Sequence, residues 1–457
     1  MTKSLSTKIG EGVFWLGTNS IIIKLVGLAS VFLILRRLSV FEYGVSELVY
    51  SVVSLLSLFL LPGLADLILA EFGREKSQNN MGAMKKLFFD YATVSLGLGI
   101  ILWAVLFFGA DIISAYYSKT VAGLLRISSF LFFTMSFRPL VRLLQDANLK
   151  FFNASLFSFT EEFAKLGFLI LFFFRFNLRI EGIFLSQIFS QVLTFLLFAP
   201  VFFTLYRNFS SAKPLADISL RQILFSHGKW AIFINYFSGL ADNLRLWIIK
   251  FFLGTEAVGL FAVAYGLYGH TSALFPLNSV VKPIIPQYFT EKEKFYKLIS
   301  KSVKYQALGY FVLSIVAFFL FPPMIGWIFP DYVASMHIFR GLIPSLVITG
   351  SAGILTSVFY AMRLQKRLVF NVVFKLVLSA VFLPVFISFF GVYGIALEFF
   401  LTAILVAWDR YAALKKALGD FRISLADFFT ADDMDKYFIK KIRQFVFSKF
   451  SFLRFNR

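Results

Sequence analysis

The chain has 457 residues, of which 59% are hydrophobic and 15% charged, and its mean hydropathy is +0.79. This is more apolar surface than a soluble core of that length could bury, so the chain belongs in lipid. The absence of cysteine excludes disulfides, thiolate metal ligands and cysteine nucleophiles. A net charge of +20 would suit nucleic-acid binding, but the positive-inside rule produces the same excess in a membrane protein.

Apolar windows bounded by charged residues, glycine or proline predict six spans in the first half of the chain. A hydrocarbon core of about 30 Å requires roughly 20 apolar residues per helix. The windows cover residues 13–35, 45–69, 87–109, 121–144, 154–174 and 182–205. The first window is too long for a signal-peptide core and lacks a small-residue cleavage site, so we expect it to be a true span.

Six further windows follow in the second half, at residues 230–253, 258–281, 305–329, 338–361, 368–390 and 392–414. The sequence therefore predicts an all-α membrane protein with about twelve transmembrane helices, arranged as two six-helix halves around a central cavity. The expected divisions are an N-terminal half, a connection, a C-terminal half and a basic tail, at residues 1–206, 207–229, 230–416 and 417–457.

The distribution of lysine and arginine predicts the orientation of these spans. With the N-terminus placed inside, basic residues in the inner connections outnumber those in the outer ones several-fold. The connections at 206–229 and 282–304 then lie in the cytoplasm, as do both termini. Because the rule for membrane proteins accounts for the basic excess, we expect no nucleic-acid partner.

The two halves also resemble each other at a constant offset of 215 residues. Trp15 matches Trp230 and Gly44 matches Gly259, as Leu38 matches Leu253 and Tyr50 matches Tyr265. Six spans per half preserve the orientation, so this is the pattern of a parallel repeat about an axis along the membrane normal. Chance similarity between two leucine- and phenylalanine-rich segments is the alternative.

A resemblance to a known family rests on the segment from Ser238 to Pro286. Its features are Asp242 within a helix, Gly254 ending that helix, the Val258-Gly259 turn and the Ala264-Tyr265 pair. This segment resembles the seventh and eighth helices of the polysaccharide transporter family, which includes the O-antigen flippases. That family belongs to the multidrug/oligosaccharidyl-lipid/polysaccharide exporter superfamily.

This resemblance implies a flippase that moves a polyprenyl-diphosphate-linked oligosaccharide across the bacterial inner membrane by alternating access. It implies membrane lipid as the surroundings, and a polysaccharide polymerase and glycosyltransferases as partners. A cation-coupled drug exporter of the same superfamily is one alternative, and would favour buried acids over bases. A membrane glycan polymerase or ligase is another, but such enzymes depend on large outer loops and the longest outer connection here is 110–120. We therefore expect no enzyme activity.

Ionisable groups within spans are costly and normally face protein or a water-filled cavity, which makes them functional candidates. In the seventh span Asp242 and Arg245 share a helix face with Asn235 and Ser238. In the fifth span the same spacing relates Ser155, Ser158, Glu162 and Lys165. Both faces are candidates to line the cavity. The alternative is an internal ion pair, Asp242 with Arg245, and Glu161 or Glu162 with Lys165.

Basic residues deep in the spans are the candidate ligands of a diphosphate headgroup, because Lys and Arg suit phosphate oxygens. Lys24 is the leading candidate, since it lies near mid-depth with no acid three or four positions away. We expect it to share a volume with Lys165, Arg245 or both, and to pair with Glu162 or Asp242 when substrate is absent. Arg138, Arg142 and Lys375 are further candidates. Arg138 and Arg142 could equally be cytoplasmic anchors.

Among the acids, Glu398 is the candidate for a coupling ion, with Glu162 and Asp242 as coupling or ion-pair residues. The three histidines have spacings that suit no metal site, and no phosphate-binding loop is present, so we expect no metal and no cofactor. Tyr265 and Tyr268 could stack on sugar rings or simply pack in the core. The stretch Phe438–Phe455 could form a basic interfacial helix, with a disordered tail as the alternative.

Overall fold

The structure is a computed structural model, and it consists of helices joined by short connections. It describes residues 22–61, 63–77, 80–115, 121–148, 150–210, 220, 224, 229–275, 277–282, 285–288, 291–419 and 421–422. Within these ranges there is no β-strand. The predicted tail helix at 438–455 and Trp15 of the repeat lie outside the described residues.

The helices form two bundles, which we call the N half and the C half. The N half contains a first helix, described over 22–37, followed by α2 (Val40–Ser57), η1 (Leu58–Leu60), α3 (Leu64–Ser77), α4 (Met81–Ala115), α5 (Val121–Ser129), α6 (Leu131–Ala147), α7 (Phe151–Ile170), η2 (Leu171–Arg175) and α8 (Ile180–Ser210). The C half contains α10 (Lys229–Leu253), α11 (Thr255–Ala273), α12 (Leu277–Val281), η4 (Ile285–Tyr288), α13 (Lys292–Ile328), η5 (Pro330–Tyr332), α14 (Ser335–Leu342), α15 (Ser345–Ala361), α16 (Gln365–Phe390) and α17 (Val392–Leu418).

Several described helices are suited to a membrane. Those long and apolar enough to cross one are α2 with η1, α4, α5 with α6, α8, α13, α16 and α17, while α14 and α15 qualify together as a pair bent by 48°. Helices α7 and α10 carry charges in mid-helix and fall outside that set, but they pack within the same bundles. The chain is an all-α membrane protein, as predicted, with about twelve membrane helices.

Several predicted boundaries differ from the structure, among them those of the second span and of the connection at 282–304. The predicted span at 45–69 begins earlier, at Val40, and breaks after Leu60, where Leu61 and Gly63 have positive φ angles of 56° and 91°. The basic run from Lys292 to Lys304, predicted as connection, is the first part of α13. Charged side chains do not interrupt the backbone hydrogen bonds of a helix, so a charge run ends the apolar window without ending the helix.

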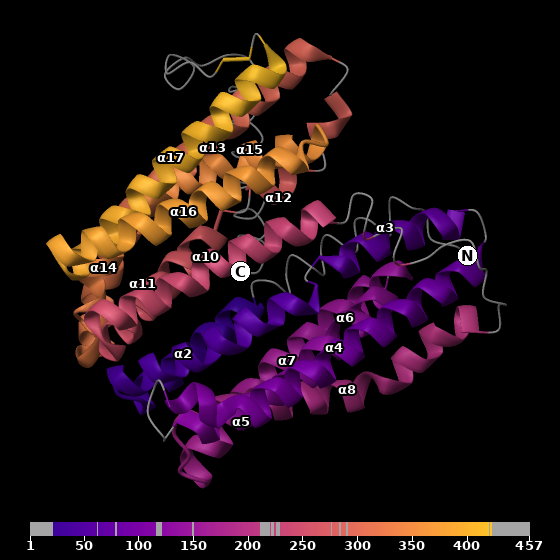
Figure 1. Cartoon of the computed structure of the whole chain (residues 1–457), viewed down its shortest axis with the longest axis horizontal. Coiled ribbons are helices and arrows are strands. Elements are labelled where there is room, and N and C mark those ends of the chain that lie inside the picture. The colour runs from indigo at the N-terminus through magenta and orange to yellow at the C-terminus, as the bar shows by residue number, and fades with distance from the viewer. Residues whose placement is uncertain are drawn as a thin grey trace, which may run out of the picture.

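The two bundles converge at one end of the molecule and diverge toward the other (Figure 1). We call the end where they meet the apex; α2, α11 and α14 lie there. Helix α2 begins at the apex with a reciprocal cap, in which Ser39 Oγ accepts from Glu42 N and Glu42 Oε2 accepts from Ser39 N at 2.9 Å. Gly254, at φ 86°, makes the tight turn between α10 and α11.

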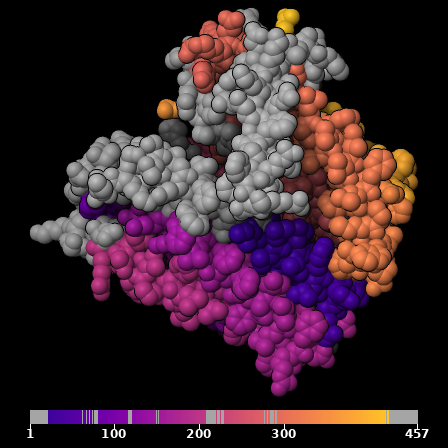
Figure 2. Space-filling view, turned by 180° about the vertical axis from the view of Figure 1, so that it is seen from behind, coloured from indigo at the N-terminus to yellow at the C-terminus, as the bar shows by residue number. Residues whose placement is uncertain are grey.

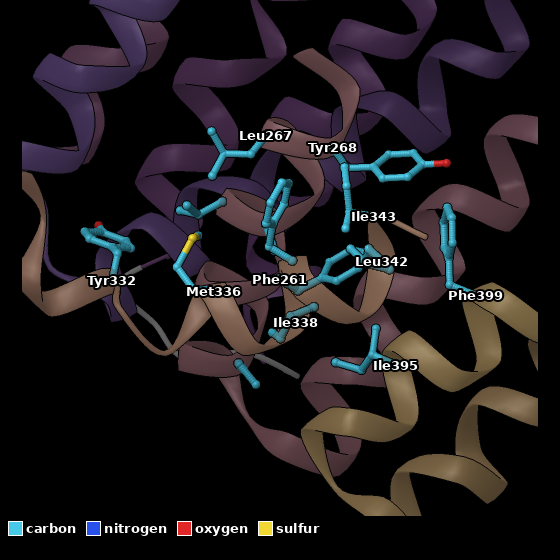
Figure 3. Close-up of a cluster of buried hydrophobic side chains, with 14 of the residues drawn as sticks. Phe261, Leu267, Tyr268, Tyr332, Met336, Ile338, Leu342, Ile343, Ile395 and Phe399 are labelled. Carbon is cyan, nitrogen blue, oxygen red and sulfur yellow. The ribbon is translucent and has the colours of Figure 1, made fainter. Parts of the chain in front are cut away.

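An apolar core at the apex holds the halves together. Its buried side chains include Phe261, Leu342 and Phe399 of the C half, shown in Figure 3, and it extends to Leu35 and Leu48 of the N half. From the rear, the indigo residues of the N half lie where the two surfaces meet (Figure 2). Because burial of apolar groups stabilises contact between the halves, this core keeps the apex closed in the described conformation.

Candidate functional site

The C half contains a buried ion pair between α10 and α17. Arg245 donates from Nε to Glu398 Oε2 at 3.2 Å and from Nη2 to Oε1 at 3.3 Å, and the two side chains are 2% and 0% exposed. Ser379 and Thr402 donate to the same Oε1 at 2.7 and 3.0 Å. The carboxylate is thus bidentate to Arg245 and satisfied by two hydroxyls, which is the geometry that a buried charge requires.

A second, more open ion pair adjoins the first. Lys375 of α16 donates to Asp242 Oδ1 at 3.0 Å, and Arg245 lies 3.8 Å from the same oxygen. Lys375 is 28% exposed and Asp242 is 44% exposed. The intrahelical Asp242–Arg245 contact therefore exists, but the shorter partner of each residue lies on another helix.

A cavity of about 180 Å³ opens beside these pairs. Its wall contains Arg245, Tyr265, Thr349, Ala352, Lys375, Phe399, Thr402, Ala403, Val406 and Arg410. Three of these side chains are cations, and Glu398 and Asp242 are not among the residues that line the cavity. The guanidinium of Arg245 also stacks over Phe399, with its carbon 4.9 Å from the ring centroid. Such a cavity suits an anionic group.

Arg410 extends the positive side of this cavity. It donates to Asn371 Oδ1 at 2.6 Å, to Thr356 Oγ1 at 2.8 Å and to the Ala352 carbonyl at 3.2 Å. These acceptors are neutral, and among the described residues no carboxylate lies within ion-pair distance of Arg410. The neighbouring Asp409 instead pairs with Arg367. Arg410 therefore presents to the cavity a charge that its own contacts do not neutralise.

The N half contains a separate polar cluster. Arg138 of α6 lies 3.1 Å from the buried Glu161 of α7, and Gln191 of α8 donates to Glu161 at 3.0 Å. Arg142 lies 3.5 Å from Asp146 and donates to Ser158 at 3.4 Å. A cavity of about 430 Å³ is lined by Ala65, Leu69, Arg138, Pro139, Arg142, Leu143 and Asp146. Both arginines thus face a cavity while binding α7.

The side chain of Lys24 in the N half makes a hydrogen bond to the C half. Its ammonium donates to the main-chain carbonyl of Ala273, at the end of α11, at 2.9 Å. The expected pairing with Glu162 or Asp242 is not what the structure has, since among the described residues Lys24 makes no ion pair. Nor is Lys24 or Lys165 in the wall of the cavity that contains Arg245. Lys165 lies close enough to Glu47 of α2 for an electrostatic interaction. Glu162 lies at a similar electrostatic range from Tyr50 of α2.

A comparison with known protein families identifies the family of the chain. The family of polysaccharide biosynthesis proteins matches residues 9–289, which is more than half of the sequence. The chain belongs to that family. A comparison with curated protein sequences gave no match.

Solved structures similar to this polysaccharide biosynthesis protein are transporters. The inward-facing conformation of a multidrug resistance MATE family transporter of the MOP superfamily is 15% identical, covers 90% of this chain and 98% of its own, and has a TM-score of 0.71. The outward-facing conformation of such a transporter has a TM-score of 0.62 at 15% sequence identity, and the match covers 90% of this chain and 96% of the other. A MOP superfamily transporter from Pyrococcus furiosus also has a TM-score of 0.62 at 15% identity, and the match covers 91% of this chain and 96% of the other. The chain therefore has the fold of these MOP superfamily transporters.

The sequence analysis names most of the charged residues in these clusters but not Arg410 or Asp146. Arg410 lies near the end of a predicted span, where a solvated charge is the ordinary expectation. Glu161 is expected there as an internal partner of Lys165, whereas the structure pairs it with Arg138. A signal for Arg410 was available, since Arg367, Asn371 and Lys375 recur every four residues along α16 and mark a polar face for α17 to meet.

Tyr265 and Tyr268, the candidate sugar platform, have different surroundings. Tyr265 lies in the cavity wall, while Tyr268 is buried and hydrogen-bonded to Thr349 Oγ1 at 2.6 Å. Their rings stack with centroids 6.0 Å apart. Figure 3 shows Tyr268 packed near Phe399 within the apolar core. Of the two, Tyr265 is the residue that a bound molecule could reach.

Proposed function

We propose that this protein is a flippase for a polyprenyl-diphosphate-linked oligosaccharide, the precursor of an O-antigen or a similar surface polysaccharide. The observation that carries the proposal is the wall of the C-half cavity, which has three cations and no carboxylate. Diphosphate is the dianionic group of such a lipid, and arginine and lysine are its natural ligands in a low-dielectric site. Membership of the polysaccharide biosynthesis family supports the same cargo class.

The size of the cavity favours a headgroup anchor over a site for the whole glycan. A volume of about 180 Å³ is below the roughly 300 to 1,000 Å³ of pockets that enclose a drug-sized ligand. The cavity would hold the charged link, the sugars would extend between the halves, and the polyprenyl chain would stay in lipid. No chemical step is required, because translocation changes only the position of the headgroup.

The distribution of lysine and arginine among the connections supports an inner-membrane protein with both termini in the cytoplasm. In that orientation the diverging end of the bundles faces the cytoplasm and the apex faces the periplasm, which is an inward-facing state. The higher TM-score with an inward-facing relative, 0.71 against 0.62, agrees with this assignment. Reporter fusions at Asp111 and Gly391 test it, since both should read periplasmic.

A drug exporter of the same superfamily is the second candidate. The aromatic part of the cavity wall, Tyr265 and Phe399, would suit a planar organic cation, and solved structures of similar fold include multidrug transporters. Against this candidate, a cation would meet Arg245, Lys375 and Arg410 without a carboxylate in the wall. The similar transporter from Pyrococcus furiosus is itself described as having a binding pocket of reversed polarity that suggests a different function.

Transport by purified protein in proteoliposomes separates these candidates. The assay compares flipping of a fluorescent lipid-linked oligosaccharide with efflux of ethidium. We expect flipping without efflux, and a loss of about tenfold to a hundredfold in flipping for Arg410→Gln, because a charge-assisted hydrogen bond contributes about 1.5 to 3 kcal/mol. Arg340→Gln, an exposed arginine at the apex, is the matched control. Ethidium efflux without flipping would overturn the proposal.

A further inference from the structure

We propose that Asp242 is a built-in competitor of the cargo: it occupies Lys375 while the cavity is empty, and a diphosphate displaces it. The competition lowers the affinity for the diphosphate by the cost of freeing Lys375, so that the cavity can release its cargo. This inference rests on the proposed function and assigns to Asp242 an affinity-setting role at the same cavity.

The two carboxylates beside the cavity differ in how firmly they are held. Glu398 is fully buried, and Arg245, Ser379 and Thr402 donate to its oxygens. Removing it would leave a buried guanidinium uncompensated. Asp242 is 44% exposed and makes one short contact, to Lys375. Displacing Asp242 therefore costs no more than breaking a half-exposed ion pair, of the kind that contributes little to stability.

The cations of the cavity wall differ in the same way. Arg245 stays in its buried ion pair with Glu398, so its charge is neutralised with or without cargo. Arg410 has only neutral acceptors among the described residues. Lys375 belongs to the wall but is held by Asp242 at 3.0 Å. Arg410 is thus available to an anion at once, whereas Lys375 becomes available only when Asp242 is displaced.

The number of phosphates decides how much this competition weakens binding. A single phosphate can bind Arg410 and leave Lys375 with Asp242, which is tethered beside it at a high effective concentration. A diphosphate engages both cations, so its affinity is reduced by the whole cost of displacing Asp242. Removing the charge of Asp242 should therefore strengthen diphosphate binding more than monophosphate binding.

Binding of two soluble probes to the full chain in nanodiscs tests the inference. The probes are farnesyl diphosphate and farnesyl monophosphate, and the quantity compared is the ratio of their dissociation constants. Asp242→Asn keeps the shape of the side chain and removes the charge that holds Lys375. We expect this variant to bind the diphosphate about threefold to tenfold more tightly, with a smaller gain for the monophosphate, so that the ratio of the two dissociation constants widens.

A double-mutant cycle separates competition at Lys375 from a general change of charge. In the Lys375→Gln background Asp242→Asn should have no further effect on the ratio, because the group it competes for is gone. Glu256→Gln, which removes an exposed acid at the apex, is the control and should leave both affinities unchanged. An equal effect of Asp242→Asn with and without Lys375 would overturn the inference.

The outcomes also distinguish this inference from the proposed function. If the natural sequence binds the diphosphate and Lys375→Gln weakens binding, but Asp242→Asn leaves the ratio unchanged or lowers the affinity, then Asp242 is not a competitor and the flippase proposal stands. If neither the natural sequence nor Asp242→Asn binds the diphosphate, the proposed function fails, and this inference with it.

Discussion

Gly44 and Gly259 lie against each other at the crossing of α2 and α11. A Cβ atom at Gly44 would be 3.1 Å from Gly259 N and closer still to the carbonyl oxygen of Thr255. A Cβ atom at Gly259 would be 3.1 Å from Gly44 N and closer still to the Val40 carbonyl oxygen. Val40 and Thr255 are themselves 215 residues apart, as are the two glycines. The halves therefore meet through equivalent backbone atoms, as in a two-fold contact.

Alanine at either glycine should open the apex. The added methyl group collides with main-chain atoms that cannot rotate away, and overpacking of this kind costs about 1 to 3 kcal/mol. We expect Gly44→Ala and Gly259→Ala to shift the population toward an apex-open state to similar extents. Spin labels at Phe41 and Trp327, exposed residues of opposite halves, report the separation, and the chain has no native cysteine to remove.

Gly266→Ala is the matched control for this prediction. It lies on the same helix as Gly259, but a Cβ there would meet nothing within 4 Å. It should leave the spin-label distances unchanged. Unaltered distances in Gly44→Ala and Gly259→Ala would show that the crossing does not determine the state of the apex.

Glu398→Gln should destabilise the protein strongly. The substitution leaves Arg245 buried at 2% exposure without its bidentate partner, and breaking a buried pair costs about 3 to 5 kcal/mol. Unfolding in detergent, followed by intrinsic fluorescence, should show a large fall in the midpoint temperature. Glu256→Gln, at an exposed position, should cause none. Replacing both Arg245 and Glu398 by Met should restore much of the loss, because no unpaired charge then remains.

Tyr332→Phe should weaken the closure of the apex. The Tyr332 hydroxyl donates to the Leu38 carbonyl at 3.0 Å across the two halves, and such a hydrogen bond contributes about 0.5 to 1.5 kcal/mol. We expect the apex-open population to rise by about twofold to tenfold in the same spin-label measurement. Tyr393→Phe removes a hydroxyl that is exposed at the same end and should change nothing. If the two variants behave alike, the hydrogen bond contributes nothing to closure.

Much of the fold could be predicted from the sequence, because lipid imposes a strong rule. Each span must satisfy its own backbone and present apolar side chains, so hydropathy alone locates helices such as α4 and α16. The break after Leu60 could not be found in this way. It depends on Leu61 and Gly63 adopting positive φ angles, and the surrounding residues are as apolar as those of a continuous helix.

The site was predictable as a set of residue types but not as a set of partners. Asp242, Arg245, Lys375 and Glu398 stand out as charges within apolar windows. Their pairing depends on which helices touch, and α10 packs on α16, which packs on α17. The repeat gives no help here, because the offset of 215 places Gly27 and Ser30 opposite Asp242 and Arg245. The backbone crossing follows the repeat, whereas the charges do not.

Lys24→Ala should abolish glycan export while leaving the protein in the membrane. Its ammonium is held by a carbonyl of the opposite half, so it is a charge that a headgroup passing between the halves would meet. Lys24→Arg should retain part of the export, because charge matters more than shape at a loosely coordinated phosphate. Surface glycan and membrane-inserted protein are measured together, with Arg36→Gln, an exposed cation on the same helix, as control. Normal export by Lys24→Ala would exclude the residue from the transport path.

The placement of polar contacts affects the free-energy cost of separating the two halves at the apex. The ion pairs Arg245–Glu398, Lys375–Asp242 and Arg138–Glu161 each join helices of one half. Hydrogen bonds from Lys24 and Tyr332 instead join one half to a main-chain carbonyl of the other. When the halves separate, the charged pairs travel intact and those single bonds are exchanged for water, at about 0.5 to 1.5 kcal/mol each. Opening of the apex therefore exposes the apolar core there but breaks none of these ion pairs.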